Sequence, residues 1–161
     1  MFDTASKIVD IETAQSLLEE IRTQGKKVVF TNGCFDLVHL GHVDYLEKAR
    51  NLGDFLVVGL NTDASVSSIK GPFRPVSPEI SRARVLASMS FIDMVVLFGE
   101  PTPKELIESI KPDILTKGND YTIETIVGAD FVIARGGSVE TIPLVQGFST
   151  SNFVSRILSN P

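Results

Sequence analysis

The sequence predicts an α/β fold built on a mostly parallel, five-stranded sheet with helices on both faces. From residue 27 onward, short apolar segments alternate with helix-like segments, which is typical of parallel strands joined by right-handed helical crossovers. Residues 55–60 show no alternation of apolar and polar positions, as a strand covered on both faces requires. In such sheets ligands bind beyond the carboxyl ends of the strands, so the loops that follow the strands are the candidate site.

Each expected helix follows from a local pattern. Apolar residues at helical spacing between Ala14 and Ile21 indicate an amphipathic helix that ends before Gly25. A proline in the first turn favours a helix over 102–110. The expected helices are 12–23, 41–49, 80–90, 102–110 and 152–158, with a short helix near Glu124.

The expected strands are 27–31, 55–60, 94–98, 113–116 and 139–145. Residues 61–78 are rich in Ser, Pro and Gly, which indicates a long loop carrying Lys70 and Arg74. Loops of this length inside a compact domain are usually functional or disordered. We expect residues 1–161 to form one domain, with 1–26 as an N-terminal helical extension.

The composition narrows the possible functions. The chain has 161 residues, 43% hydrophobic and 22% charged, which is ordinary for one globular domain. Because the formal net charge is −5, general affinity for nucleic acid or anionic membranes is not expected. A single cysteine excludes an internal disulfide. The N-terminus lacks the pattern of a secretory signal, and no apolar stretch approaches roughly 18 residues. We therefore expect a cytoplasmic protein.

The chain's two histidines lie three residues apart, at His39 and His42. They follow a strand and a glycine-containing loop and begin a helix, where free backbone N–H groups and the helix dipole favour anions. At this spacing both imidazoles can face one ligand. Gly41 between them lets a phosphate approach the backbone closely. The motif therefore predicts a site for a phosphate-bearing ligand.

Residues 31–42, Thr-Asn-Gly-Cys-Phe-Asp-Leu-Val-His-Leu-Gly-His, resemble the signature of the HxGH nucleotidyltransferases, which share a Rossmann-like fold. The resemblance extends from about residue 27 to residue 157. It is closest to the adenylyltransferase domain of bacterial bifunctional heptose-phosphate kinase/adenylyltransferases. It implies a partner kinase on a separate chain, and family members are often homodimers. Further matching stretches are 61–63, 70–71, 74–76, Arg82, 117–118, 120–121 and 149–152.

The resemblance implies transfer of AMP from ATP to a sugar 1-phosphate, with D-glycero-D-manno-heptose 1-phosphate as the acceptor, giving ADP-heptose and pyrophosphate. The attacking phosphate oxygen is already an anion, so catalysis needs alignment and charge stabilisation rather than a strong base. His39 and His42 are expected to donate to the triphosphate, and Lys70 and Arg74 to neutralise it. Mg²⁺ is expected to bridge the phosphates through water and substrate oxygens rather than a protein cage.

The resemblance implies two further groups of site residues. The expected nucleotide-binding residues are Asn32, Gly33, Cys34, Phe35, Gly41, Arg82, Lys117, Gly118, Asp120, Ser149, Thr150 and Ser151. The expected substrate-binding residues are Asp36, Asn61, Asp63 and Tyr121.

Other interpretations stay open at this point. Lys70 and Arg74 could be solvated loop charges, and Arg82 could pair with Glu79. A catalytic Cys34 is disfavoured because a small residue at a strand end usually packs or offers its backbone. A zinc site would need a recognised ligand spacing, which is absent from the sequence. A nicotinamide-dependent oxidoreductase is disfavoured because no Gly-x-Gly-x-x-Gly follows the first strand.

The sequence departs from the related families at two places. Asn119 replaces a glycine in the stretch 117–120, where it could alter the base pocket, although asparagine tolerates a left-handed backbone. Residues 144–146 read Leu-Val-Gln where glycerol-phosphate cytidylyltransferases carry an arginine. The alternatives are a cytidylyltransferase acting on glycerol 3-phosphate, an enzyme similar to FAD synthetase, and a non-catalytic nucleotide-binding module.

Overall fold

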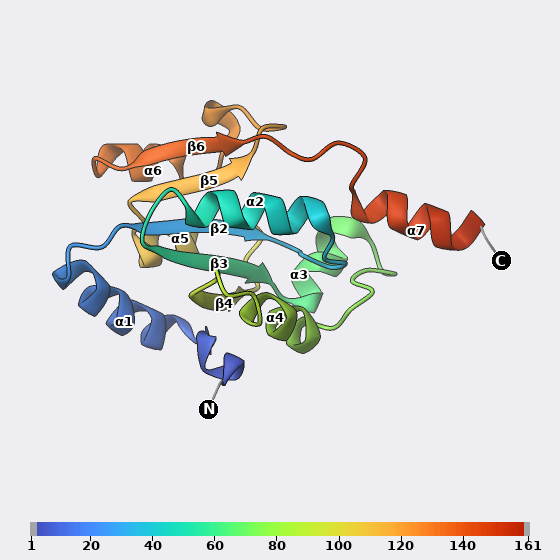
Figure 1. The fold of residues 1–161 in the computed structure, drawn as a ribbon, viewed down its shortest axis with the longest axis horizontal. Coiled ribbons are helices and arrows are strands. Elements are labelled where there is room, and N and C mark those ends of the chain that lie inside the picture. Colours follow the sequence, from blue (N-terminus) through green and yellow to red (C-terminus); the bar gives the residue numbers. More distant parts are fainter. Residues whose placement is uncertain (1–2, 160–161) are drawn as a thin grey trace.

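The computed structural model describes residues 3–159, which form a parallel sheet covered by helices (Figure 1). The ends of the expected 1–161 domain, residues 1–2 and 160–161, lie outside the described residues. Within residues 3–159 the sheet has six strands in the order β1-β4-β3-β2-β5-β6. The strands are β1 (Ile8–Val9), β2 (Val28–Gly33), β3 (Phe55–Asn61), β4 (Met94–Phe98), β5 (Ile114–Gly118) and β6 (Ser138–Ile142).

Helices cover both faces of the sheet. On one face, α1, α5 and α6 pack through residues such as Leu18, and on the other face α2 and α4 pack through residues such as Leu46. In β2, Phe30 points to the first cluster and Val29 to the second, so this strand is buried on both sides. The predicted fold class is therefore confirmed. The helices are α1 (Ile11–Thr23), α2 (Leu40–Arg50), α3 (Asp63–Lys70), α4 (Glu79–Ala87), α5 (Lys104–Ile110), α6 (Ala129–Ala134) and α7 (Thr150–Ser159), with the 3₁₀ turns η1 (Thr4–Lys7) and η2 (Ile123–Thr125).

The sixth strand, β1, is an addition to the five that the sequence predicted. Its Ile8 and Val9 pair with Val95 and Val96 of β4 at the edge of the sheet. The strand lies in the segment 1–26, which was expected to be helical and does contain α1. Two residues are too few to show a period of any kind, so no sequence pattern could reveal this strand.

The prediction of one long loop over 61–78 was wrong. Residues 63–70 form α3, which confines the loop to 71–78. Thr62 is the N-cap of this helix, and its Oγ1 accepts a hydrogen bond from Ser65 N at 3.3 Å. The helix is rich in serine, and Val66 is its one fully buried apolar side chain, so hydrophobic periodicity gave too weak a signal. Lys70 consequently sits at a helix end rather than in a long mobile loop.

The strand order reverses at β2, which creates a crevice between β2 and β5. Pairing of β2 with β3 continues to Gly33, whereas β2 and β5 pair only at Val29–Ile114 and Phe30–Leu115. Beyond these pairs the two strands separate. Ligands of open α/β sheets bind at such a switch point. Figure 1 shows that the first turn of α2 lies at this end of the sheet, and that α7 lies there as well. Across residues 3–159, no helix combines the length and the apolar character needed to cross a membrane.

Candidate active site

A cavity of about 530 Å³ lies at the carboxyl ends of the central strands, against the first turns of α2 and α7. Most of the residues that the sequence singled out meet in its wall. Three of them, Asp63, Arg74 and Arg82, do not line it. The predicted residues that do are Asn32, Gly33, Cys34, Phe35, Asp36, His39, Gly41, His42, Asn61, Lys70, Lys117, Gly118, Asp120, Tyr121, Ser149, Thr150 and Ser151.

The two imidazoles stack against each other at the start of α2. His39 is the N-cap and His42 lies in the first turn. Their ring centroids are 3.9 Å apart and their planes are inclined by 20°. The Nδ1 atoms of both rings are buried and have no hydrogen-bond partner within the described part of the chain. Ring stacking is therefore the main contact between the two side chains.

Aromatic side chains from two other segments complete this packing. Phe153 of α7 stacks on His39, with centroids 5.7 Å apart and planes 11° apart. Phe35, in the loop after β2, meets His42 edge-on at 5.3 Å. The position of α7 is thus coupled directly to the imidazole pair. We call Phe35, His42, His39 and Phe153 the ring column.

The environment keeps both imidazoles neutral near pH 7. Burial, then the charges of His39 and Lys70, lower the pKa of His42 from 6.5 to about 4. Burial also lowers the pKa of His39. A neutral imidazole offers one N–H donor. A bound polyphosphate would favour the charged form and so raise both pKa values.

Two ammonium groups flank β2 in the cavity wall. Lys70 ends α3, after β3, and Lys117 lies in β5 on the other side of β2. Lys117 Nζ donates a hydrogen bond to the Asn32 carbonyl oxygen at 3.1 Å. Burial lowers the pKa of Lys117 to about 8, although the charges of Cys34 and Asp120 raise it. Both lysines are therefore placed to neutralise a polyanion.

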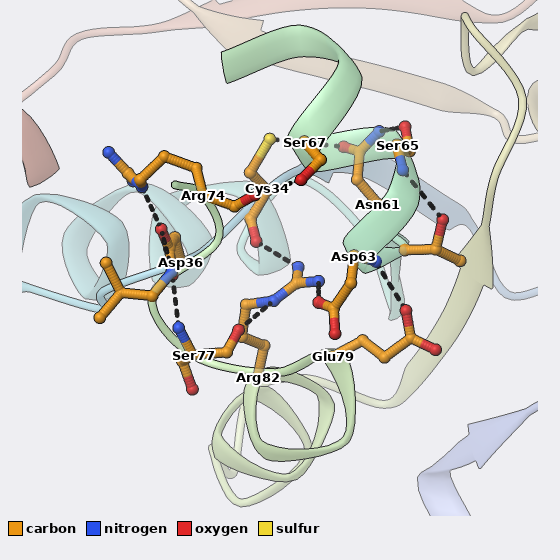
Figure 2. Close-up of polar contacts among 12 residues, drawn as sticks. Cys34, Asp36, Asn61, Asp63, Ser65, Ser67, Arg74, Ser77, Glu79 and Arg82 are labelled. Carbon is orange, nitrogen blue, oxygen red and sulfur yellow. Dashed lines mark hydrogen bonds and ion pairs between the residues drawn. The ribbon is translucent and has the colours of Figure 1, made fainter. Parts of the chain in front are cut away.

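Asp36 holds the loop 71–78 against the loop after β2, as Figure 2 shows. Its Oδ2 lies 2.6 Å from Arg74 Nε, and its Oδ1 accepts hydrogen bonds from Val76 N at 2.8 Å and Ser77 N at 2.9 Å. Burial raises the pKa of Asp36, but these N–H groups and the guanidinium together bring it below its usual value. Asp36 therefore fixes the position of this loop, and its expected contact with substrate stays a prediction. We call this contact the loop clamp.

Arg82 lies behind the cavity and is 1% exposed. Figure 2 shows its guanidinium between three segments: it donates to Cys34 O at 2.6 Å, Ser77 O at 3.0 Å and Asp63 Oδ1 at 2.7 Å. Asp63 N in turn donates to Glu79 Oε2 at 2.6 Å. The expected direct contacts of Arg82, Arg74 and Asp63 with substrates stay predictions, since protein groups engage all three side chains.

The loop after β5 forms the opposite wall of the cavity. Asn119 does not adopt a left-handed backbone. Its N–H donates to Ile142 O at 3.0 Å, and its Oδ1 accepts from Leu144 N at 3.3 Å. The Asn119 side chain therefore ties this loop to the segment after β6.

The start of α7 presents a row of hydroxyl groups to the cavity. Ser149, Thr150 and Ser151 all line it. Ser149 Oγ accepts a hydrogen bond from Asn152 N at 3.1 Å, which is an N-cap contact. The first N–H groups of a helix have no partner within the helix and favour anions, so this turn can receive a phosphate beside the imidazole pair.

Sequence reasoning did not assign some of the cavity residues. Tyr45 follows His42 by three residues, so helical spacing could have found it. The apolar members lie in or beside segments expected at this edge of the sheet, but an apolar side chain in a loop gives no sign that it contacts a ligand. The residues missed are Tyr45, Ile69, Pro101, Pro103, Leu144, Val145 and Phe148. Among residues 3–159, no group of three or more His, Cys, Asp or Glu side chains is placed to hold a metal ion.

The family model described as cytidylyltransferase-like matches residues 30–145, which include the cavity's signature loop and the strands around it. The chain therefore belongs to the cytidylyltransferase-like family, whose members are nucleotidyltransferases.

Relatives named bifunctional protein HldE match nearly the whole chain, and two of them serve as examples. The bifunctional protein HldE of Syntrophotalea carbinolica is 59% identical over 153 residues, which are 95% of this chain and 31% of the relative. The bifunctional protein HldE of Caulobacter vibrioides is 57% identical over 153 residues, 95% of this chain and 32% of the relative. The chain thus spans about a third of the length of these curated relatives.

Solved structures agree with this assignment. The lipopolysaccharide core biosynthesis protein of Thermoplasma volcanium superposes with a TM-score of 0.60 at 30% identity, covering 75% of this chain and 98% of that one. Pantoate-beta-alanine ligase of Francisella tularensis superposes with a TM-score of 0.64 at 16% identity, covering 96% of this chain and 79% of that one. The second likeness concerns the fold alone.

Proposed function

We propose that the chain is an adenylyltransferase that transfers AMP from ATP to a sugar 1-phosphate, namely D-glycero-D-manno-heptose 1-phosphate. The observation that carries the proposal is the convergence of both histidines, two lysines and the first turn of α7 on one cavity. The relatives named HldE, more than half identical over this stretch, support adenylyl transfer to heptose in particular.

In the proposed reaction an oxygen of the acceptor phosphate attacks the α-phosphorus of ATP. A new oxygen–phosphorus bond forms while the bond from the α-phosphorus to the β-phosphate breaks, and pyrophosphate leaves in line with the attack. No group of the protein has to remove a proton, because the attacking oxygen is ionised. The protein's task is alignment and stabilisation of the charge on the phosphoryl oxygens.

The residues of the cavity can divide this task between them. The imidazoles of His39 and His42 donate to the phosphoryl oxygens and gain positive charge as the polyphosphate raises their pKa. The ammonium groups of Lys70 and Lys117 neutralise the triphosphate from the two sides of β2. The first N–H groups of α7, at Thr150, receive a further phosphate.

Nucleotidyltransferases generally use Mg²⁺ together with ATP. Asp36, the carboxylate nearest the imidazole motif in the sequence, is already occupied by the loop clamp. Asp120 is the other carboxylate in the cavity wall. With so few carboxylates, the cavity fits a Mg²⁺ that would be held mainly by phosphate oxygens and water, with Asp120 as the protein group that could assist. When bound there, Mg²⁺ would neutralise charge that develops on the phosphates.

Pyrophosphate release, measured over a matrix of nucleotides and acceptors, tests the proposal. The nucleotides are ATP, CTP, GTP and UTP, and the acceptors are heptose 1-phosphate, glycerol 3-phosphate and riboflavin 5′-phosphate. We expect release with ATP and heptose 1-phosphate only. Release with CTP and glycerol 3-phosphate would identify a cytidylyltransferase instead, and ATP binding without release from any pair would indicate a non-catalytic module.

The proposal also defines the reaction that must precede this one. The acceptor carries its nucleophilic phosphate on the anomeric oxygen, and we propose that a kinase places it there, as the bifunctional relatives suggest. We propose that both steps occur in the cytoplasm, where ATP is made and used.

A further inference from the structure

Three hydroxyl groups bridge β2, β5 and α2 where the two strands separate. Tyr45 Oη of α2 lies 2.8 Å from Thr31 Oγ1 of β2 and donates to Thr116 Oγ1 of β5 at 3.1 Å. Both threonines are fully buried, and Tyr45 is almost so. The last paired residues of the two strands are Phe30 and Leu115, so the hydroxyls occupy the first position beyond the pairing. We call Thr31, Tyr45 and Thr116 the hydroxyl triangle.

Each member of the hydroxyl triangle adjoins a segment of the candidate active site. Tyr45 lies one helical turn after His42, on the helix that carries both imidazoles. Thr116 directly precedes Lys117. Thr31 directly precedes Asn32, whose carbonyl oxygen accepts the hydrogen bond from Lys117 Nζ. A single phenolic oxygen therefore connects the imidazole helix to both walls of the crevice.

The energetics of the hydroxyl triangle favour a fixed geometry. A buried hydroxyl that loses its partners costs on the order of 1–3 kcal/mol, so these groups resist separation. Buried networks with every member satisfied rigidify their surroundings and favour one arrangement. An apolar side chain such as phenylalanine would fill the space of Tyr45 equally well. The Tyr45 hydroxyl, through its contacts with Thr31 and Thr116, also fixes the distance between β2 and β5.

We propose that Tyr45 is a positioning residue for nucleotidyl transfer, whose hydroxyl sets the first turn of α2, and hence His42, relative to Lys117 across the crevice. The inference rests on the proposed function and assigns a role within the same site. Tyr45 does not itself have to touch the reacting atoms.

The Tyr45→Phe variant removes one oxygen and is expected to fold. Without the phenol, the two threonine hydroxyls can still donate to backbone oxygens: Thr31 Oγ1 lies 3.3 Å from Thr116 O, and Thr116 Oγ1 lies 3.4 Å from Phe30 O. The matched control is Thr23→Val, which removes the exposed hydroxyl that donates to Glu20 O in α1, away from the cavity. Thermal unfolding of both variants establishes that they are folded.

Steady-state kinetics are the first test. A misplacement of about 1 Å can lower turnover by as much as about a hundredfold, so we expect kcat of Tyr45→Phe to fall by about tenfold or more, with KM for ATP changed far less. Thr23→Val keeps the wild-type kcat. A Tyr45→Phe kcat within about twofold of wild type would overturn the proposal, whatever the change in Tm.

A double-mutant cycle separates positioning from general loosening. Thr116→Val removes the partner hydroxyl with little change of shape. If the two hydroxyls act as one unit, Tyr45→Phe/Thr116→Val is no slower than the slower single variant. If the effects on kcat multiply, the hydroxyl triangle does not act as a unit and the proposal fails.

An NMR titration gives an answer that does not depend on turnover. The chain has only two histidines, so the two imidazole Cε1–H signals can be assigned with a His39→Gln variant. Burial lowers the pKa of His42 to about 4, so a ring that moves out of its packed position in Tyr45→Phe should show a higher pKa, whereas the pKa should stay in place in Thr23→Val. Absence of turnover from every substrate pair would defeat the proposed function, whereas an unmoved His42 pKa would defeat the positioning role.

Discussion

At the scale of single residues, the spacing of the two histidines predicted that they share a ligand. It did not predict the protonation state of the two imidazoles in the free protein. Spacing places both on one helical turn, and the structure confirms that they are adjacent. Phe35, which contacts His42, belongs to the same motif, but Phe153, which stacks on His39, comes from the far end of the chain. The depressed pKa of His42 is therefore a product of tertiary packing and could not have been predicted from the motif.

His42→Ala is the direct test of the imidazole pair. Loss of a preorganised donor to a developing charge costs about a hundredfold or more in kcat, and we expect a decrease of at least that size. The control is Lys48→Ala, which removes an exposed charge from the same helix together with its ion pair to Asp44. Pyrophosphate release measures kcat, and circular dichroism establishes that the helix persists. Near-normal turnover of His42→Ala would refute the assignment.

The low pKa of His42 predicts that ATP binding takes up protons. The free ring is neutral above about pH 4, and bound triphosphate raises its pKa. Between the free and the bound pKa the complex holds more protons than the free protein, so affinity rises as pH falls through this window. Calorimetry in two buffers of different ionisation enthalpy measures the uptake. His42→Gln should reduce it, and an unchanged uptake would mean that the protons go elsewhere.

At the scale of elements, the sequence signals were strong for amphipathic helices and weak for α3. That helix contributes one fully buried apolar side chain, Val66, and depends on its Thr62 cap. The sequence also did not predict that the loop 71–78 is held in place. Asp36 and Arg74 are far apart in sequence, and only the fold brings Asp36 Oδ2 to 2.6 Å from Arg74 Nε. Polar contacts between distant loops leave no periodic trace in a sequence.

We expect the loop clamp to protect residues 71–78 from proteases. Asp36→Asn keeps the side-chain shape but removes the charge that pairs with Arg74. Hydrogen bonds to charged groups contribute about 1.5–3 kcal/mol, so we expect chymotrypsin to cut after Phe73, which is 93% exposed, about tenfold faster than in wild type. The control, Asp44→Asn, breaks the exposed pair with Lys48. Equal cleavage rates in the two variants would show that Asp36 does not hold the loop. ATP should slow the cleavage of the wild-type chain.

At the scale of the whole molecule, five of the six strands within residues 3–159 could be predicted. Three of them, β2, β3 and β4, have a continuous apolar run, and β5 and β6 follow from their alternation with helix-like segments. The strand order could not, since a sequence shows which residues are buried but not which strands are neighbours. The candidate site was nevertheless largely predictable. Parallel strands bring their carboxyl ends to one edge, so loops that follow different strands must meet there.

The two-sided core predicts where substitutions are costly. Leu115 of β5 is fully buried, whereas Leu17 of α1 is 40% exposed. Leu→Ala at a buried site costs about 2–5 kcal/mol through lost burial and the remaining cavity, so we expect a loss in that range for Leu115→Ala and well under half of it for Leu17→Ala. Chemical denaturation gives both free energies of unfolding. Similar losses at the two sites would contradict this burial pattern.

The only cysteine of the chain stands in the wall of the cavity, and this gives the molecule a built-in reporter. Burial raises the pKa of the Cys34 thiol, so alkylation should be slow near neutrality and accelerate as the thiolate forms at higher pH. A nucleotide in the cavity would shield the sulfur, so maleimide labelling should slow in proportion to occupancy. One mass measurement per time point would then yield a dissociation constant without any engineered label, and an acceptor that leaves the labelling rate unchanged does not cover the Cys34 sulfur.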